Sequence, residues 1–361
     1  MISSKPTRPV SALILALAAV FALDALCFRT GLYPSILEPD SSAGLLELVL
    51  RREQRAQARY GDNVIVTLGD SRFAYYPRVA NTLTPETGFV FRHAGVAGTD
   101  IRSWYYLLRD LDPTRQRYRA IVLGLDDYDD EDGPYDVADD LSSLHYLVAR
   151  LRLRDLVDFP RTFHDPMARW SAFRGSLLKG TILQQDIQAF LSHPLKRIEY
   201  VQLCDRSYEE WTYGFVETQK NVAGLKIDWA KLTATFPFDN QALRDQLTRY
   251  VLYHPFPQTG TRHRYRREWF ERLIDTYRGS RTKLVFLRLP RGPVPRPDDL
   301  VAKPRGAVRD LASRPGVLVM NEHAFDSLEN PELFKDAFHL NDAGCTQFAS
   351  RMAEQVSAMV R

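Results

Sequence analysis

Two short segments, far apart in the chain, carry side chains suited to nucleophilic catalysis. One is Gly69–Arg72 (GDSR), directly after an apolar, β-branched run; the other is Asp336–His339 (DAFH), with a carboxylate and an imidazole three residues apart. Such spacing lets one turn aim both side chains at one point, so that His339 can accept the Ser71 proton while Asp336 fixes the tautomer of the ring. The sequence therefore predicts a triad of Ser71, His339 and Asp336.

The elements that must position these segments are those of a parallel α/β sheet. Short apolar runs typical of buried strands lie at residues 63–68, 88–92, 119–123, 283–289 and 317–320. Periodicity predicts a helix over residues 100–111, capped by Thr99 or Asp100, and a closing helix over residues 342–360. Because open parallel sheets bind ligands at the carboxyl ends of their strands, Ser71 follows its strand where a site is expected.

Both segments resemble blocks of the SGNH/GDSL hydrolase superfamily. The first family block has a Gly-Asp-Ser core after the first strand and the last block is Asp-x-x-His, and both occur here in that order. The resemblance covers residues 63 to about 127 and 283 to the end. It implies a three-layer, SGNH-like (flavodoxin-like) α/β domain that acts as a serine acyltransferase or esterase and uses no cofactor.

The same resemblance implies an oxyanion hole. The second family block supplies a glycine N–H to this hole, and residues 93–98 (HAGVAG) match it, with Gly98 as the expected donor and Gly95 as the second candidate. Ser71 itself is the other backbone member expected. Arg72, next to the nucleophile, has two interpretations of equal weight: it binds a substrate anion, or it forms a salt bridge.

The third family block departs from the pattern. It is normally Gly-x-Asn-Asp, whereas this chain has Gly124–Asp127 (GLDD), which places Asp126 at the asparagine position of the oxyanion hole. An ionised Asp126 cannot donate a hydrogen bond and would repel an oxyanion. Either it is protonated, the register shifts, or another group completes the hole; loss of one such donor slows catalysis by about 10²–10³-fold.

An N-terminal apolar segment predicts a membrane anchor. Residues 10–28 contain one charge, Asp24, and as a helix of about 1.5 Å per residue they come close to the ~30 Å hydrocarbon core. Lys5 and Arg8 precede them, so the N-terminus is expected in the cytoplasm and the remainder outside. A cleaved secretory signal is the alternative, although no clean small-x-small cleavage site follows. We expect a single-pass protein of the inner (cytoplasmic) membrane with a periplasmic catalytic domain.

Four segments follow from these patterns: the cytoplasmic tip and anchor (1–30), two parts of the SGNH-like domain (31–127 and 282–361), and a large, mainly helical insertion or lid (128–281).

With 48 Lys+Arg against 45 Asp+Glu, the charge gives no argument for a nucleic-acid partner, and none is predicted. Three scattered cysteines exclude a disulfide framework or zinc site. The acidic residues 126–140 lack the glutamate spacing of a calcium loop, so no metal is assigned.

An anchor joined to an SGNH-like domain resembles the membrane-tethered O-acyltransferases of bacterial envelope polymers. That resemblance implies that Ser71 accepts an acyl group, expected to be acetyl, from a multispanning membrane acyltransferase and passes it to a polysaccharide hydroxyl. A carbohydrate or lipid esterase is the first alternative, because both enzymes form the same acyl-enzyme and differ in whether a sugar hydroxyl or water reaches it. A catalytically silent scaffold for a multispanning acyltransferase is the second, motivated by Asp126.

Overall fold

The computed structural model describes residues 8–57, 61–73, 76–125, 128, 140–213, 222–252, 260–295 and 308–361. The chain divides into two compact units. The smaller consists of residues 1–48 and 139–205, and the larger of residues 49–138 and 206–361. The segment 128–281, expected as one insertion, is therefore shared between the two units.

A five-stranded parallel sheet forms the centre of the larger unit. Its order is β2-β1-β3-β6-β7, with β1 at Val64–Leu68, β2 at Val90–His93, β3 at Ala120–Leu125, β6 at Lys283–Arg288 and β7 at Val317–Val319. Counted along the chain, this is the doubly wound order 2-1-3-4-5, which opens a crevice between the first and third strands at their carboxyl ends. The predicted parallel α/β sheet is confirmed.

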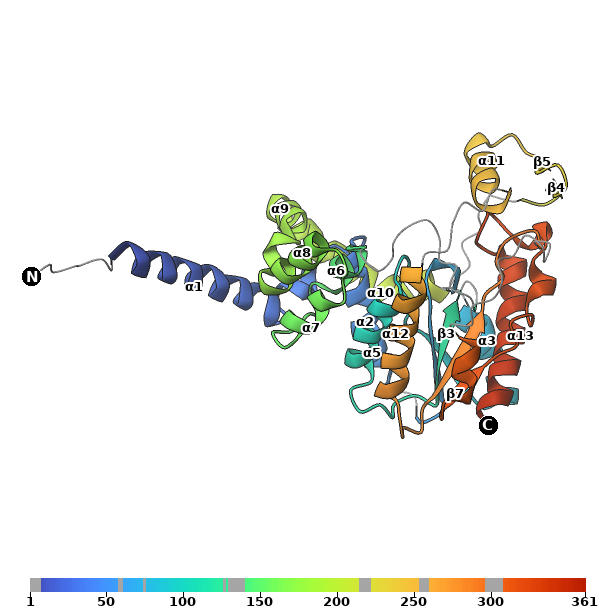
Figure 1. Cartoon of the computed structure of the whole chain (residues 1–361), viewed down its shortest axis with the longest axis horizontal. Coiled ribbons are helices and arrows are strands. Elements are labelled where there is room, and N and C mark those ends of the chain that lie inside the picture. The colour runs from blue at the N-terminus through green and yellow to red at the C-terminus, as the bar shows by residue number, and fades with distance from the viewer. Residues whose placement is uncertain are drawn as a thin grey trace, which may run out of the picture. The chain divides into compact units, whose positions relative to one another are not determined.

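Helices cover both faces of the sheet, which explains why its strands are continuous apolar runs. In Figure 1, α5 (Ile101–Leu111) and α12 (Gly260–Thr276) lie on one face, and α3 (Tyr76–Ala80) and α13 (Asp342–Val360) on the other. All residues of β1 and β3 are buried between these layers. In α12, Phe270 packs edge-on against Phe286 of β6, with ring centroids 5.2 Å apart. Helix α12, predicted within the insertion, is thus part of one helical layer.

Side-chain caps fix the start of the two helices that follow the site loops. Asp100 accepts a hydrogen bond from the Ser103 N–H (3.0 Å) at the N-terminus of α5, as predicted. Asn341 accepts one from the Gly344 N–H (3.0 Å) at the N-terminus of α13. Since Asn341 lies two residues after His339, the cap also fixes the loop that carries the imidazole.

The smaller unit is helical. It contains α1 (Arg8–Arg29), the first part of α2 (Ser42–Gln57), α6 (Ser142–Leu147), α7 (Asp155–Arg161), α8 (Pro166–Leu177), α9 (Gln184–Ser192) and most of α10 (Pro194–Tyr213). Other elements of the larger unit include α4 (Thr84–Thr87), a hairpin of β4 (Lys226–Asp228) and β5 (Thr233–Thr235), and α11 (Gln241–Leu247). Within α1, residues 10–29 are long and apolar enough to cross a membrane, which confirms the predicted apolar N-terminal helix.

The packing of α13 against the sheet predicts a stability effect. Phe348 is fully buried and lies 4.5 Å from Phe325 and 6.1 Å from Phe73, between ring centroids. Phe348→Ala should lower the free energy of unfolding by about 3–5 kcal/mol because it leaves a cavity in the core. Phe348→Leu, which keeps more of the volume, should lose less. Urea unfolding of the full-length chain in detergent measures both; an alanine variant as stable as the parent would contradict the packing.

Candidate active site

Three side chains from the two motif-bearing loops form a continuous hydrogen-bond relay. Ser71 Oγ lies 2.8 Å from His339 Nε2, and His339 Nδ1 lies 3.0 and 2.9 Å from the two carboxylate oxygens of Asp336. A proton on Nδ1 that is donated to Asp336 leaves Nε2 as the acceptor for the Ser71 hydroxyl. The structure thus brings together the residues predicted as a triad, in the order needed to make the serine nucleophilic.

A short 3-10 turn, Ser71–Phe73, presents the serine directly beyond β1. The Phe73 N–H donates to the Asp70 carbonyl (3.1 Å), and the fully buried Phe73 ring packs beside Gly69. A Cβ at Gly69 would lie 2.8 Å from the Phe73 side chain, so the turn requires glycine there. Packing of the Phe73 ring against the protein core therefore holds the turn, and with it the Ser71 hydroxyl, at the edge of the sheet.

The carboxylate of Asp336 is held in its charged form. Its Oδ1 accepts hydrogen bonds from the backbone N–H groups of Phe338 and His339, each at 2.8 Å. Burial alone would raise the pKa of Asp336, but its hydrogen bonds and charge interaction with His339, together with these N–H donors, lower it below the usual value. An ionised Asp336 can therefore orient the imidazole and stabilise its protonated form.

Arg72 pairs with its neighbour Asp70. The Arg72 guanidinium bonds the Asp70 carboxylate, with Nε 3.0 and 3.1 Å from the two oxygens, and the Arg72 backbone N–H donates to the same group (2.9 Å). Burial would raise the pKa of Asp70, but the charge and hydrogen bonds of Arg72 lower it. The structure shows the salt bridge, and the substrate-binding role of Arg72 stays a prediction.

The loop after β2 passes directly against the serine turn. A Cβ at the buried Gly95 would lie 2.4 Å from the Gly69 carbonyl oxygen, so only glycine permits this approach. Gly98 is exposed and has φ of +75°, in the left-handed region that favours glycine. The oxyanion roles of Ser71, Gly95 and Gly98 stay predictions. Asp126 lies outside the described residues.

His93, the first residue of the HAGVAG motif, supports this loop, a role that the motif itself does not predict. It is buried, with Nδ1 3.0 Å from Thr67 Oγ1 in the neighbouring strand. Burial and the nearby charge of Arg92 lower the pKa of His93 to about 3, so the ring stays neutral and does not compete with His339 as a base. Its place at the end of β2, beside β1, was the available sequence signal.

In the described part of the chain, no group of three or more His, Cys, Asp or Glu side chains is arranged to hold a metal ion.

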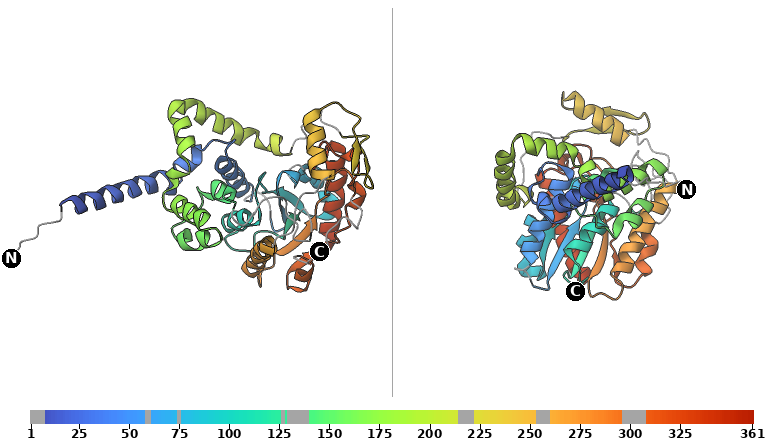
Figure 2. Two further views of the ribbon diagram at one scale, coloured as in Figure 1. Left: turned by 45° about the horizontal axis from the view of Figure 1, so that its top comes forward. Right: turned by 90° about the vertical axis from the view of Figure 1, so that its left-hand side faces the viewer.

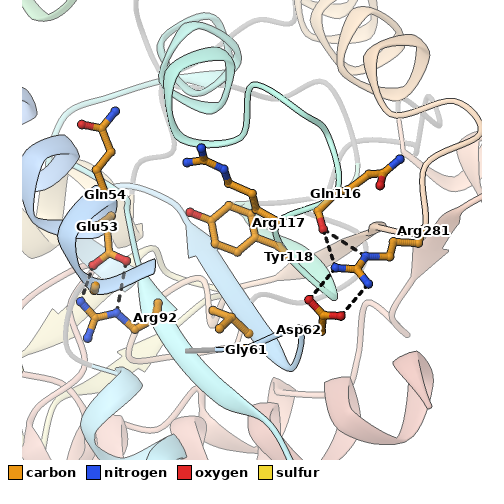
Figure 3. Close-up of a pocket in the computed structure, with 11 residues that line it drawn as sticks. Glu53, Gln54, Gly61, Asp62, Arg92, Gln116, Arg117, Tyr118 and Arg281 are labelled. Atoms are coloured by element: carbon orange, nitrogen blue, oxygen red, sulfur yellow. Dashed lines mark hydrogen bonds and ion pairs between the residues drawn. The ribbon is translucent and has the colours of Figure 1, made fainter. Parts of the chain in front are cut away.

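A cavity of about 480 Å³ lies at the other edge of the sheet (Figure 3). Its walls include residues just before β1, β3 and β6, whereas Ser71 follows β1. Figure 3 shows two ion pairs in its walls, Arg92 with Glu53 (2.7 Å) and Arg281 with Asp62 (2.8 Å). This cavity therefore does not serve as the substrate pocket of the Ser71 relay.

Comparison with known proteins leaves the site to be interpreted from its geometry. No protein-family model matches the sequence, and no curated protein matches it. The resemblance to the SGNH/GDSL superfamily therefore stays an expectation that depends on the two motifs. The relay itself is independent of that resemblance.

The depressed pKa of Asp336 predicts a pH-dependent stability. The ionised Asp336 contributes fully to the free energy of unfolding above about pH 3.9, the pKa that this carboxyl group has in the unfolded chain. The contribution is lost as the pH falls through the lower pKa of the folded state. Asp336→Asn should lose about 1–3 kcal/mol at pH 7, and the gap to the parent should narrow below about pH 4. Urea midpoints from pH 7 to 3.5 measure this, with the exposed Asp239→Asn as control. A difference in stability between the parent and the Asp336→Asn variant that does not change with pH would refute the lowered pKa of Asp336.

The contact between the two glycine loops predicts a catalytic effect. Gly95→Ala forces the loop away from Gly69, and a shift of about 1 Å at a reacting group can cost about 10²-fold in rate. The rate of Ser71 labelling by a fluorophosphonate should fall by at least tenfold. Gly61→Ala, where an added Cβ meets nothing within 4 Å, is the matched control and should keep the parental rate. Equal labelling of both variants would show that the contact is not needed.

Proposed function

We propose that this chain is a serine acyl-transfer enzyme with Ser71 as nucleophile. The observation that carries the proposal is the relay from Ser71 through His339 to Asp336. Ser71 Oγ attacks the acyl carbonyl as its proton passes to His339 Nε2, and the departing group takes that proton from the imidazolium. The acyl-enzyme then reacts with an acceptor hydroxyl by the same steps in reverse, while Asp336 stays ionised throughout.

We assign the larger unit to the SGNH/GDSL superfamily within this proposal. The 2-1-3-4-5 strand order supports it, as does the position of the Gly-Asp-Ser turn after β1 and of the Asp-x-x-His turn before α13. Both turns meet at one edge of the sheet, where their side chains bond. An oxyanion hole from the N–H groups of Ser71 and of Gly98 or Gly95 would complete the site.

The acceptor in this proposal is a hydroxyl of a cell-envelope polysaccharide or exopolysaccharide outside the cytoplasm. Helix α1, which is long and apolar enough to span a membrane, supports a membrane-anchored enzyme. An anchored enzyme can receive its acyl group, expected to be acetyl, from a multispanning membrane acyltransferase. The basic residues Lys5 and Arg8, which precede the apolar run of this helix, favour an extracytoplasmic catalytic unit.

Hydrolysis is the competing outcome at the same serine. The His339 side chain is 27% exposed, so water reaches the relay in this conformation. An acyl-enzyme open to water acts as an esterase unless the acceptor sugar displaces that water. The partition between water and a sugar hydroxyl therefore decides between the two functions.

Replacement of the nucleophile tests the proposal. Ser71→Ala should abolish fluorophosphonate labelling and acylation of the polymer in cells, because the remaining residues cannot form the acyl-enzyme. Ser313→Ala, at an exposed serine bonded to its own turn, should keep both. Unchanged polymer acylation in the Ser71 variant would refute the transferase. Rapid hydrolysis of p-nitrophenyl acetate with no transfer to sugars would identify an esterase.

A further inference from the structure

Exposed apolar side chains are concentrated in the smaller unit. Among the described residues, every exposed large apolar side chain except Leu232 belongs to that unit, although the larger unit contains more of the chain. Many lie on α1, and others lie on helices α7 to α10, among them Val157, Met167, Trp170, Leu191 and Leu195, with Leu153 just before α7. Water-facing surfaces normally scatter such residues singly, so this concentration indicates an apolar neighbour.

The C-terminal turns of α1 are built into the helices of the smaller unit. The Asp24 carboxylate accepts a hydrogen bond from the Gly180 backbone N–H (2.8 Å), and the buried Phe28 belongs to the unit's apolar core. The Arg29 guanidinium donates to the Ser176 carbonyl (2.7 Å). These contacts make the end of α1 a structural part of the unit, so a cleaved N-terminal signal would remove part of that core.

The freely exposed part of α1 is too short to cross a bilayer by itself. Residues 10–20 are exposed on all sides, and at about 1.5 Å per residue they cover roughly 16 Å of the ~30 Å hydrocarbon core. From Phe21 onward one face packs against the unit, with Asp24 and Phe28 buried, while Leu23 and Leu26 stay exposed on the other face. The apolar stretch therefore continues along the free face of α1 that carries Leu23 and Leu26, so that the end of α1 reaches the membrane boundary together with the helical unit.

Several polar groups at this junction are bonded within the protein, as a low-dielectric surrounding favours. Lys179 Nζ donates to the Ala149 carbonyl (2.7 Å), and burial together with the charge of Arg29 lowers the pKa of Lys179 to about 7. Arg150 is paired with the buried carboxylate of Glu47. The right-hand view of Figure 2, seen from the N-terminal side, shows the green helices of this unit lying around the base of α1.

We propose that the smaller unit sits in the outer interfacial region of the lipid bilayer, with exposed side chains of α8, α9 and the start of α10 inserted at the boundary between headgroups and acyl chains. Met167, Trp170, Leu191 and Leu195 are the residues that we assign to this contact. The helices that carry them belong to the same compact unit as the C-terminal turns of α1, which hold that unit at the apolar helix, and this is why lipid is the partner. The inference rests on the proposed membrane anchoring by α1 and does not depend on the acyl chemistry.

Lipid quenching of a fluorescent label tests this seating. The full-length chain, with Cys27, Cys204 and Cys345 replaced by Ala, receives one cysteine by Met167→Cys or Leu191→Cys, and by Leu232→Cys as an exposed control in the larger unit. Each variant carries the fluorophore NBD and enters nanodiscs of phosphatidylcholine and phosphatidylglycerol. Doxyl-labelled lipid should quench positions 167 and 191 at least twofold and leave position 232 unchanged.

Three outcomes overturn the inference. Quenching at neither position above the Leu232 level would remove lipid as the partner, and shielding from aqueous iodide without lipid quenching would identify a protein-facing surface. A chain that does not enter nanodiscs would overturn the seating and the anchor together. Ser71 labelling by a fluorophosphonate in the same samples separates these results from a failure of the catalytic proposal.

Discussion

The hydrogen bond between Ser71 and His339 joins residues 268 positions apart, so it forms only if the first strand and the last helix of the sheet meet at one edge. Parallel topology supplies that edge, because every strand delivers its carboxyl end to the same side. Aromatic packing between Phe73 and Phe348 ties the serine turn to α13, and the Asn341 cap ties the histidine loop to the start of that helix. The relay is thus a product of the whole sheet.

Much of the sheet could be predicted because buried parallel strands are continuous apolar runs with clear ends. The first was expected at residues 63–68 and is observed at Val64–Leu68, and Asp100 caps α5 as expected. The ends of the helices within residues 128–281, expected to be mainly helical, were harder to predict. Helix α6 ends at Leu147, and the Asp155 carboxylate accepts the Arg152 N–H (2.7 Å), a local bond that competes with a continuous helix.

The identity of the relay residues was visible in the sequence, but their surroundings were not. That Gly95 touches Gly69, or that His93 bonds Thr67, depends on which loops and strands become neighbours in the fold. Arg72 allowed two interpretations in the sequence because a guanidinium bonds a protein carboxylate and a substrate anion equally well. Likewise, the split of residues 128–281 between two units follows from contacts such as Phe270 with Phe286, which composition does not record.

The bond between Asp24 and the backbone at residues 179 and 180 also sets an order of events during biosynthesis. In an anchored chain, the apolar helix enters the bilayer while its partner, about 155 residues later, has not yet been translated. At about 5–20 residues per second, the ribosome needs roughly 8–30 seconds to supply it. During that interval the Asp24 carboxylate has to find other partners, and the contact between α1 and the rest of the unit forms only after the later segment has been synthesised.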